Sequence, residues 1–184
     1  MLIAITGLKH SGKSTATTIL QEILGYEVRS FATKLKEMIC LMTGCTMANL
    51  EDYDFKENAI VPQHLWAYCS NDRHNYRSLL QGVGDLMRSK NPNIFVEFEL
   101  HDNPTNVIIS DCRMLNEAKA IKEKGGVIVR IERKSCESNG DSHKSETELN
   151  AIVPDYIVDN NGSIKDLANN LNTMTQLWRI FDKV

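Results

Sequence analysis

The chain has 184 residues, of which 42% are hydrophobic and 24% are charged, and these values are ordinary for a globular protein with a single core. A net charge of −3 gives no support for a nucleic-acid or membrane partner, and no apolar run approaches membrane-spanning length. The five cysteines are odd in number and lack metal-ligand spacing, which indicates reduced thiols in a cytoplasmic protein.

A glycine-rich loop follows the first predicted strand, which covers residues 2–5. Residues 7–14, GLKHSGKS, satisfy the pattern G-x-x-x-x-G-K-[ST] at every fixed position, and a helical pattern continues to Gly25. In this context the loop N–H groups and the helix N-terminus bind phosphate, because glycine lets the backbone approach closely. We expect a nucleoside triphosphate, with Lys13 on its β- and γ-phosphates and the Ser14 hydroxyl on Mg²⁺. The expected phosphate-side residues are Gly7, Lys9, His10, Ser11, Gly12, Lys13, Ser14 and Thr15.

The next part of the chain contains only one predicted strand, over residues 26–31, which is followed by a helix over residues 32–42. Residues 44–63 are polar, acidic and weakly periodic, and we interpret them as a mobile insertion that covers a ligand. Residues 65–76 show no clear period. This long segment is where a second substrate can be held.

A helix predicted over residues 77–87 contains two glycines, Gly82 and Gly84. Each costs about 1 kcal/mol relative to alanine in a helix interior. Such a cost invites a reason, for example the close approach of a ligand. A further short helix is predicted over residues 94–100.

Residues 106–110 are apolar on both faces, as expected for a buried strand of a parallel sheet. This strand delivers Asp111, Cys112 and Arg113 to its carboxyl end, where ligands bind in open α/β sheets. Asp111 is therefore a candidate to orient Mg²⁺ or its waters, and a helix N-cap role is compatible with that.

The remaining elements alternate between helix and strand. Helix 115–124, strand 127–131, a polar loop over 134–144, a capping-box helix start at 145–148 and strand 156–158 are predicted in that order. A last helix begins after Ser163 as N-cap, and its apolar stripe consists of Ile164, Leu167, Ala168, Leu171, Met174, Leu177 and Phe181.

Five strands that are nearly all followed by helices predict a three-layer α/β/α fold with a five-stranded parallel sheet. We expect a single domain over residues 1–184, with an acceptor-side insertion over about 32–100 and a short lid over about 133–146.

The phosphate loop alone does not separate kinases from ATPases and GTPases, but the Asn-Lys-x-Asp guanine motif of a GTPase is missing. Four arginines on different segments can converge in this topology, although a solvated surface position is the default for each. Transfer to an acceptor that is itself a phosphate requires such positive charge and no general base. These arginines are Arg77, Arg88, Arg113 and Arg133.

Several runs resemble the phage deoxynucleoside monophosphate kinases, which are P-loop nucleotide kinases. Besides the phosphate loop, these runs are FATKLK at 31–36, LLQGVGD at 79–85 and DCRMLNE at 111–117. DSHKSE at 141–146 and NNGS at 160–163 look like that family's lid end and its adenine-side loop. The resemblance covers most of the chain except about residues 44–72.

The resemblance implies transfer of the γ-phosphate of ATP, with Mg²⁺, to a deoxynucleoside 5′-monophosphate, giving the diphosphate and ADP. It implies a cytoplasmic enzyme, in the host cytoplasm if the chain is phage-encoded, and is compatible with a homodimer. Lys13, Asp111, Arg113 and Arg133 would be catalytic, Ser14 and Asp111 would hold the metal, and Asn161 and Gly162 would lie on the donor side. The acceptor would be bound by Lys36, Lys56, Arg77, Gln81, Gly84, Asp85, Arg88, Phe95, Asp111, Arg113 and Glu117.

Two other functions stay open from the residues. One is a P-loop kinase for another small acceptor, such as dephospho-coenzyme A or a nucleoside, which needs a general base near the phosphate loop. The residues after the first strand offer no aspartate for that task. The other is a nucleotide-binding switch without small-molecule turnover.

Overall fold

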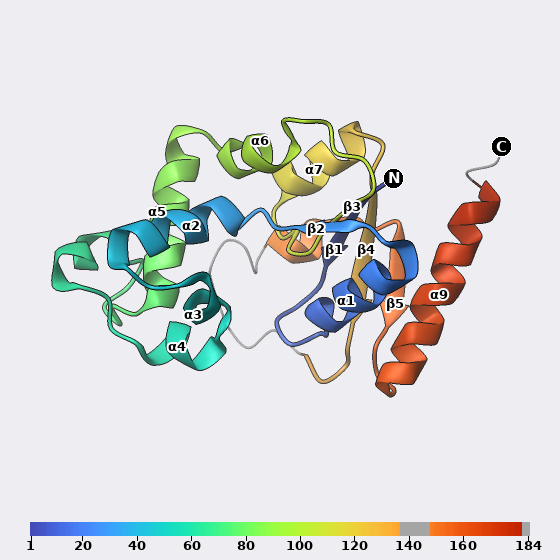
Figure 1. The fold of residues 1–184 in the computed structure, drawn as a ribbon, viewed down its shortest axis with the longest axis horizontal. Coiled ribbons are helices and arrows are strands. Elements are labelled where there is room, and N and C mark those ends of the chain that lie inside the picture. The colour runs from blue at the N-terminus through green and yellow to red at the C-terminus, as the bar shows by residue number, and fades with distance from the viewer. Residues whose placement is uncertain (137–147, 182–184) are drawn as a thin grey trace. The chain divides into compact units, whose positions relative to one another are not determined.

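The computed structural model of the protein describes residues 1–136 and 148–181. Its sheet has five parallel strands, and Figure 1 shows how the helices lie around it. The strand order is β2-β3-β1-β4-β5, so the strand that leads into the phosphate loop lies in the centre. The prediction of a five-stranded parallel sheet is therefore confirmed. The strands are β1 (Leu2–Thr6), β2 (Glu27–Arg29), β3 (Val107–Ile109), β4 (Val127–Glu132) and β5 (Tyr156–Asp159).

Helices cover both faces of the sheet. In Figure 1, α1 and α9 lie beside each other on one side of the strands and α7 lies on the other. Successive side chains of a strand point to opposite faces, and all five residues of β1 are buried because both faces are covered. The helical elements of this part are α1 (Lys13–Leu24), α7 (Leu115–Glu123), the 3₁₀-helix η2 (Glu148–Ala151) and α9 (Ile164–Phe181).

The chain divides into two compact units. The core unit comprises Met1–Ser30 and Leu100–Val184, and the insertion unit comprises Phe31–Glu99. The single domain with an acceptor-side insertion over about 32–100 stays a prediction. The elements of the insertion unit are α2 (Thr33–Thr43), α3 (Met47–Glu51), α4 (Tyr53–Asn58), the 3₁₀-helix η1 (Gln63–Tyr68), α5 (Tyr76–Lys90) and α6 (Ile94–Leu100), whose last residue is assigned to the core unit.

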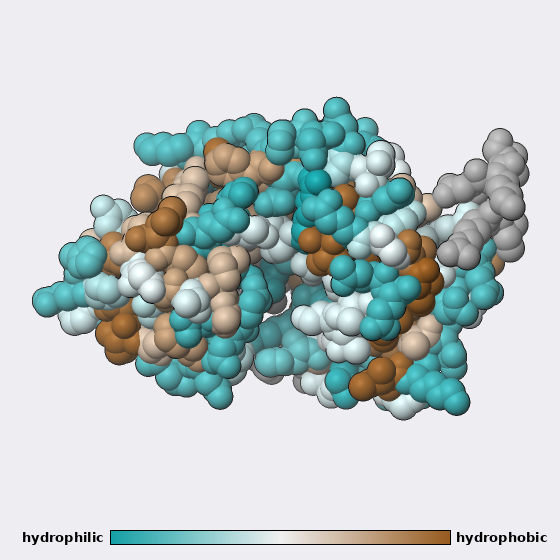
Figure 2. Space-filling model, in the orientation of Figure 1, coloured by the Kyte–Doolittle hydropathy of each residue, from teal (hydrophilic) through white to brown (hydrophobic). Residues whose placement is uncertain are grey.

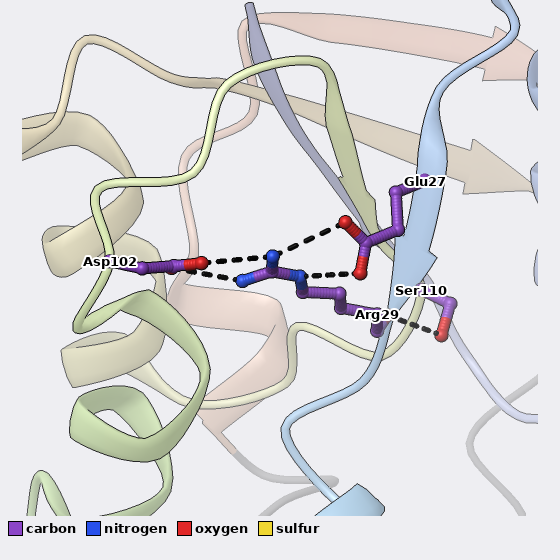
Figure 3. A network of polar contacts seen from close by, with 4 residues as sticks. All are labelled: Glu27, Arg29, Asp102 and Ser110. Atoms are coloured by element: carbon purple, nitrogen blue, oxygen red, sulfur yellow. Dashed lines mark hydrogen bonds and ion pairs between the residues drawn. The ribbon is translucent and has the colours of Figure 1, made fainter.

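The edge strand β2 is shorter than the predicted strand over residues 26–31, because its partner β3 offers only three residues. Arg29 fastens this edge (Figure 3). Its guanidinium donates to the Glu27 carboxylate at 2.9 and 3.2 Å and to both Asp102 oxygens at 3.0 Å. Its carbonyl oxygen accepts bonds from the backbone N–H and the hydroxyl of Ser110. These bonds hold β2 to Asp102, before β3, and to Ser110, directly after it.

Residues 44–63, predicted as a weakly periodic insertion, contain two short helices. Each helix begins at a side-chain N-cap: Thr46 accepts from the N–H of Asn49 at 3.2 Å, and Asp52 accepts from the N–H of Phe55 at 2.6 Å. Helices of five and six residues are too short to display an apolar period, so local capping is what marks them.

The glycines of α5 are explained by packing within the insertion unit. A Cβ at Gly82 would lie 2.0 Å from the carbonyl oxygen of Tyr68, and a Cβ at Gly84 would lie 3.2 Å from the side chain of Leu35. The suggestion that a ligand's approach accounts for the helix glycines is therefore wrong for Gly82, because the chain's own backbone fills that space.

The last helix begins as predicted, with Ser163 and Asp166 forming reciprocal cap bonds. Its buried stripe differs from the prediction at both ends. Ile164 is 69% exposed and Leu177 is 43% exposed, whereas Trp178 is buried. Counted from Leu167, the buried stripe follows the spacing i, i+4, i+7, i+11, which places Trp178 in it and leaves Leu177 outside. The buried members are Leu167, Leu171, Met174 and Trp178.

Parts of two predicted features lie outside the described residues, namely most of the lid over 133–146 and the capping box over 145–148. The side chain of Phe181 lies outside them as well. Within residues 1–136 and 148–181, no helix has the length and apolar character that a bilayer span requires. The side of the molecule seen in Figure 2 is mostly hydrophilic, with hydrophobic patches between.

Candidate active site

The phosphate loop joins β1 to α1 and depends on its glycines. Gly7 has φ 145° and Gly12 has φ 98°, values that side chains with a Cβ rarely adopt. A Cβ on Gly7 would lie 2.5 Å from the carbonyl oxygen of Ile131, and a Cβ on Gly12 would lie 2.2 Å from the amide nitrogen of Asn160. The loop therefore packs directly on the ends of β4 and β5.

Lys13 folds back over this loop. Its Nζ donates to the carbonyl oxygens of Gly7 at 2.8 Å and Leu8 at 2.6 Å, which holds the ammonium group within the curve of the loop. The Ser11 hydroxyl is buried and has no hydrogen-bond partner among the described residues. Gly12 is the N-cap residue of α1 and has no side chain to cap the first N–H groups of the helix. An oxyanion at this position would satisfy these donors, so the residues fit the phosphates of a nucleotide.

Asn160 supports the loop from behind and was not among the predicted site residues. Its side-chain N–H donates to the carbonyl oxygen of Ser11 at 2.8 Å, and its backbone N–H donates to Glu132 at 2.8 Å. The predicted donor-side residue Asn161 lies next to it, exposed, and accepts a bond from the backbone N–H of Lys134 at 2.8 Å. An asparagine directly after the last predicted strand was the available signal for Asn160, and the donor-side role of Asn161 stays a prediction.

A cavity of about 280 Å³ opens beside the phosphate loop. The predicted residues Gly7, Ser11, Asn161 and Arg133 all line this cavity, so the structure brings these four to one place. The cavity also contains Arg130, which was not predicted. Arg130 donates to the carbonyl oxygens of Leu149, at 3.2 Å, and Ile152, and thereby fixes the segment around η2. The remaining lining residues are Leu8, Ile131, Glu132, Lys134, Cys136, Leu149, Asn150 and Asp159.

Asp111 follows the last residue of β3 by two positions, and β3 lies beside the central strand that leads to the loop. The Ser30 hydroxyl donates to its carboxylate at 2.7 Å. The N–H of Cys112 donates to the carbonyl oxygen of Ile5 at 3.1 Å, which ties this turn to the end of β1. Burial raises the pKa of the Cys112 thiol well above its usual value, and the nearby carboxylates of Glu117 and Asp111 add to the shift.

Glu117 is buried and caps the start of α7. One of its carboxylate oxygens accepts the backbone N–H groups of Arg113 at 2.8 Å and Met114 at 3.0 Å. Glu117 was predicted as an acceptor-binding residue and not as this cap, although a glutamate at the third helical position is the signature of such a cap. The cap fixes the backbone that carries Arg113.

In the described part of the chain, no three His, Cys, Asp or Glu side chains gather as a metal cluster. Mg²⁺ in phosphoryl-transfer sites is held by one or two protein groups together with substrate phosphates. The Ser14 hydroxyl, exposed on the first turn of α1, and the Asp111 carboxylate are groups of that kind.

Three of the predicted acceptor residues of the insertion unit are basic groups whose side chains contact a glutamate. The Lys36 ammonium lies 2.6 Å from the carboxylate of Glu51, and Lys56 donates to the backbone carbonyl of Glu51 at 3.3 Å. Arg77 forms an ion pair with Glu57. Two of the lysines therefore meet at the end of α3.

A second group surrounds the end of α5. The Arg88 guanidinium lies 4.8 Å from the ring centre of Phe95 and 3.6 Å from the Asp85 carboxylate. Phe95 is buried within the insertion unit, and Gly84 packs against Arg88. On the preceding turn, the Gln81 side chain accepts from the hydroxyl of Ser70 at 3.1 Å.

A parallel sheet of order 2-3-1-4-5 with a phosphate loop after its central strand is the architecture of a P-loop kinase. Dephospho-CoA kinase from Campylobacter jejuni is similar in fold, with a TM-score of 0.50 over 95% of each chain and 14% identity. Shikimate kinase from Aquifex aeolicus has a TM-score of 0.49 over 98% of this chain and 99% of the other, with 17% identity.

Sequence comparison gives the family. The family model for deoxynucleotide monophosphate kinase matches residues 86–171. A protein of Acanthamoeba polyphaga mimivirus, provisionally named a deoxynucleotide monophosphate kinase, is 31% identical over 189 residues, covering 93% of this chain and 94% of that protein. The chain belongs to the deoxynucleotide monophosphate kinase family, as the resemblance in its motifs predicted, and is a phosphotransferase with a nucleotide-binding P-loop.

Proposed function

We propose that this enzyme transfers the γ-phosphate of ATP to a deoxynucleoside 5′-monophosphate, giving the diphosphate and ADP. The observation that carries this proposal is the phosphate loop, in which three features surround a place for an oxyanion. They are the Lys13 ammonium, the Ser11 hydroxyl without a partner among the described residues, and the uncapped start of α1. Family membership supports a nucleotide as the acceptor.

On the donor side, the loop N–H groups would cradle the phosphates and Lys13 would exchange its bonds to loop carbonyls for bonds to the β- and γ-phosphates. We expect Ser14 and Asp111 to hold Mg²⁺ with the ATP phosphates, where the ion supplies further neutralising charge. Asn160 would keep the loop in its shape while the ligand changes.

On the acceptor side, the attacking oxygen belongs to a phosphate and is already anionic, so no residue has to remove a proton. Catalysis would then consist of positioning and charge neutralisation. We assign Arg113 and Arg133 to that task, and we assign Lys36 and Arg77 to binding of the acceptor nucleotide, as the family resemblance implies. Arginine suits it because its planar fork donates two bonds to one phosphate.

The test is an assay of the purified protein with ATP, Mg²⁺ and a panel of deoxynucleoside monophosphates, with Lys13→Ala as the inactive control. We expect diphosphate and ADP in equal amounts with at least one acceptor. Dephospho-coenzyme A and deoxynucleosides belong in the same panel, because phosphorylation of a hydroxyl would identify the other kinase class. ATP binding without any phosphorylated product would contradict the proposal and favour a nucleotide-dependent switch.

A further inference from the structure

Arg77 stands in the first turn of α5 and is held by two side chains of α4. Its Nε donates to the carboxylate of Glu57, and its guanidinium carbon lies 5.6 Å from the ring centre of Tyr53. We propose that Glu57 and Tyr53 are positioning residues, which set the guanidinium of Arg77 for the phosphate of the acceptor nucleotide. The inference rests on the proposed function through the acceptor role of Arg77.

The ion pair is sheltered from solvent. The side chains of Arg77 and Glu57 are 29% and 16% exposed, so water and salt screen their attraction less than they screen a surface pair. The pair of Lys34 and Glu37 on α2 is the contrasting case, because its side chains are 46% and 45% exposed. A sheltered carboxylate can therefore hold the orientation of an arginine.

The two helices that carry this pair are fastened to each other. The backbone carbonyl of Glu57 accepts the side-chain N–H of Asn75 at 2.7 Å, and Asn75 in turn caps α5 through Ser78. The rings of Phe55 and Tyr76 are 4.7 Å apart, one from each helix. Since the backbones of α4 and α5 are fixed relative to each other, Glu57 meets Arg77 in a defined geometry.

Arginine has five N–H donors in one plane, and the bond to Glu57 uses the donor on Nε. The two terminal amino groups then form the edge that two phosphate oxygens can accept from. An aromatic ring near the guanidinium limits its rotation and adds a cation–π attraction. Glu57 can keep its bond while a phosphate binds, so it prepares the site without competing for it.

The primary experiment compares Glu57→Gln with Asp54→Asn, which removes an exposed carboxylate from the same helix. We expect Glu57→Gln to raise KM for the best deoxynucleoside monophosphate about tenfold, the size expected for coupled neighbours, and to leave KM for ATP within about twofold. Asp54→Asn should change neither constant. In the Arg77→Ala background the Glu57 effect should vanish, because there is no guanidinium left to orient.

The aromatic contact has its own pair of variants. Tyr53→Phe keeps the ring and should behave as the parent enzyme, whereas Tyr53→Leu should raise KM for the acceptor alone. The ¹⁵N NMR signal of the Arg77 Nε–H gives a readout that needs no turnover. It should exchange slowly in the parent and in Asp54→Asn, exchange fast in Glu57→Gln, and shift when the monophosphate is added.

Three results would overturn the inference. A lower acceptor KM in Glu57→Gln would show that the carboxylate competes with the phosphate. An equal effect of Glu57→Gln with and without Arg77 would show a role in stability only. An Arg77 signal that does not respond to the monophosphate would remove Arg77 from the site, even if the enzyme makes diphosphates. If the Arg77 signal responds but the parent enzyme shows no turnover, the result would count against the proposed function and not against this inference.

Discussion

Arg113 is the residue whose replacement best separates the two nucleotides. Its backbone N–H is held by the buried carboxylate of Glu117, so removal of the side chain leaves the cap of α7 in place. We expect Arg113→Ala to lower kcat/KM for the monophosphate by at least about 100-fold, as for the loss of a group that stabilises transition-state charge. The Kd of ATP, measured by calorimetry, should stay within about threefold of the parent value. Equal losses for both nucleotides would place Arg113 on the donor instead.

Residues of a local motif could be predicted from the sequence, and residues that act over long range could not. Lys13 and the loop glycines follow from a pattern of eight consecutive residues. Asn160 contacts a loop residue 149 positions away, and Arg130 binds carbonyl groups some twenty positions ahead. Such contacts depend on the order of strands in the sheet, which periodicity does not contain.

At the scale of an element, the packing of α5 predicts whether one glycine substitution raises or lowers the free energy of unfolding. Helix propensity alone favours alanine over Gly82 by about 1 kcal/mol. The contact with the carbonyl of Tyr68, at 2.0 Å for an ideal Cβ, opposes that gain. We expect Gly82→Ala to lower the free energy of unfolding by about 1–3 kcal/mol, as overpacking does. Urea denaturation measures this change, with Ser89→Ala on the exposed face of α5 as the control variant. A Gly82→Ala variant that is more stable than the parent would contradict the prediction.

The stability that the Arg29 contacts give to the edge strand β2 depends on pH. Hydrogen bonds from Arg29 lower the pKa values of Glu27 and Asp102 in the folded protein. Their stabilising effect is therefore complete above the ordinary carboxylate pKa of about 4 and is lost as the pH falls through the lowered values. The difference in urea midpoint between the parent and Arg29→Gln should be largest near neutral pH and should shrink towards about pH 2. A difference that stays constant with pH would show that Arg29 stabilises the strand by packing alone.

For the whole molecule, the number of strands and their parallel direction were predictable, because buried parallel strands are continuous apolar runs bounded by glycine or charge. In the stretch from residue 31 to 99, periodicity predicted the helices over 32–42, 77–87 and 94–100, but not the short helices between the first two. These short helices are specified by caps at Thr46 and Asp52, and the stretch's own core holds it together. The buried residues of that core include Leu35, Ile39, Leu50, Leu65, Leu79, Val83 and Phe95.

Cys112 reports on how the core unit unfolds as a whole. All five cysteines are free thiols, and Cys112 is fully buried. Burial and the neighbouring carboxylates raise its pKa, so at a given pH less of it is the reactive thiolate. We expect disulfide reagents to label Cys45 quickly and Cys112 only at the rate of global unfolding, with Cys112→Ser as the control that identifies the slow phase.

The rate of that slow phase distinguishes two views of the turn formed by residues 111–113. Cys112 stands between Asp111 and Arg113, and its backbone bond to Ile5 joins this turn to the central strand. If the turn belongs to the cooperative core, denaturant should accelerate labelling of Cys112 with the same dependence as the unfolding rate itself. Labelling of Cys112 as fast as Cys45 would show that the turn opens locally. Asp111 and Arg113 would then be positioned by the bound nucleotides and not by the fold.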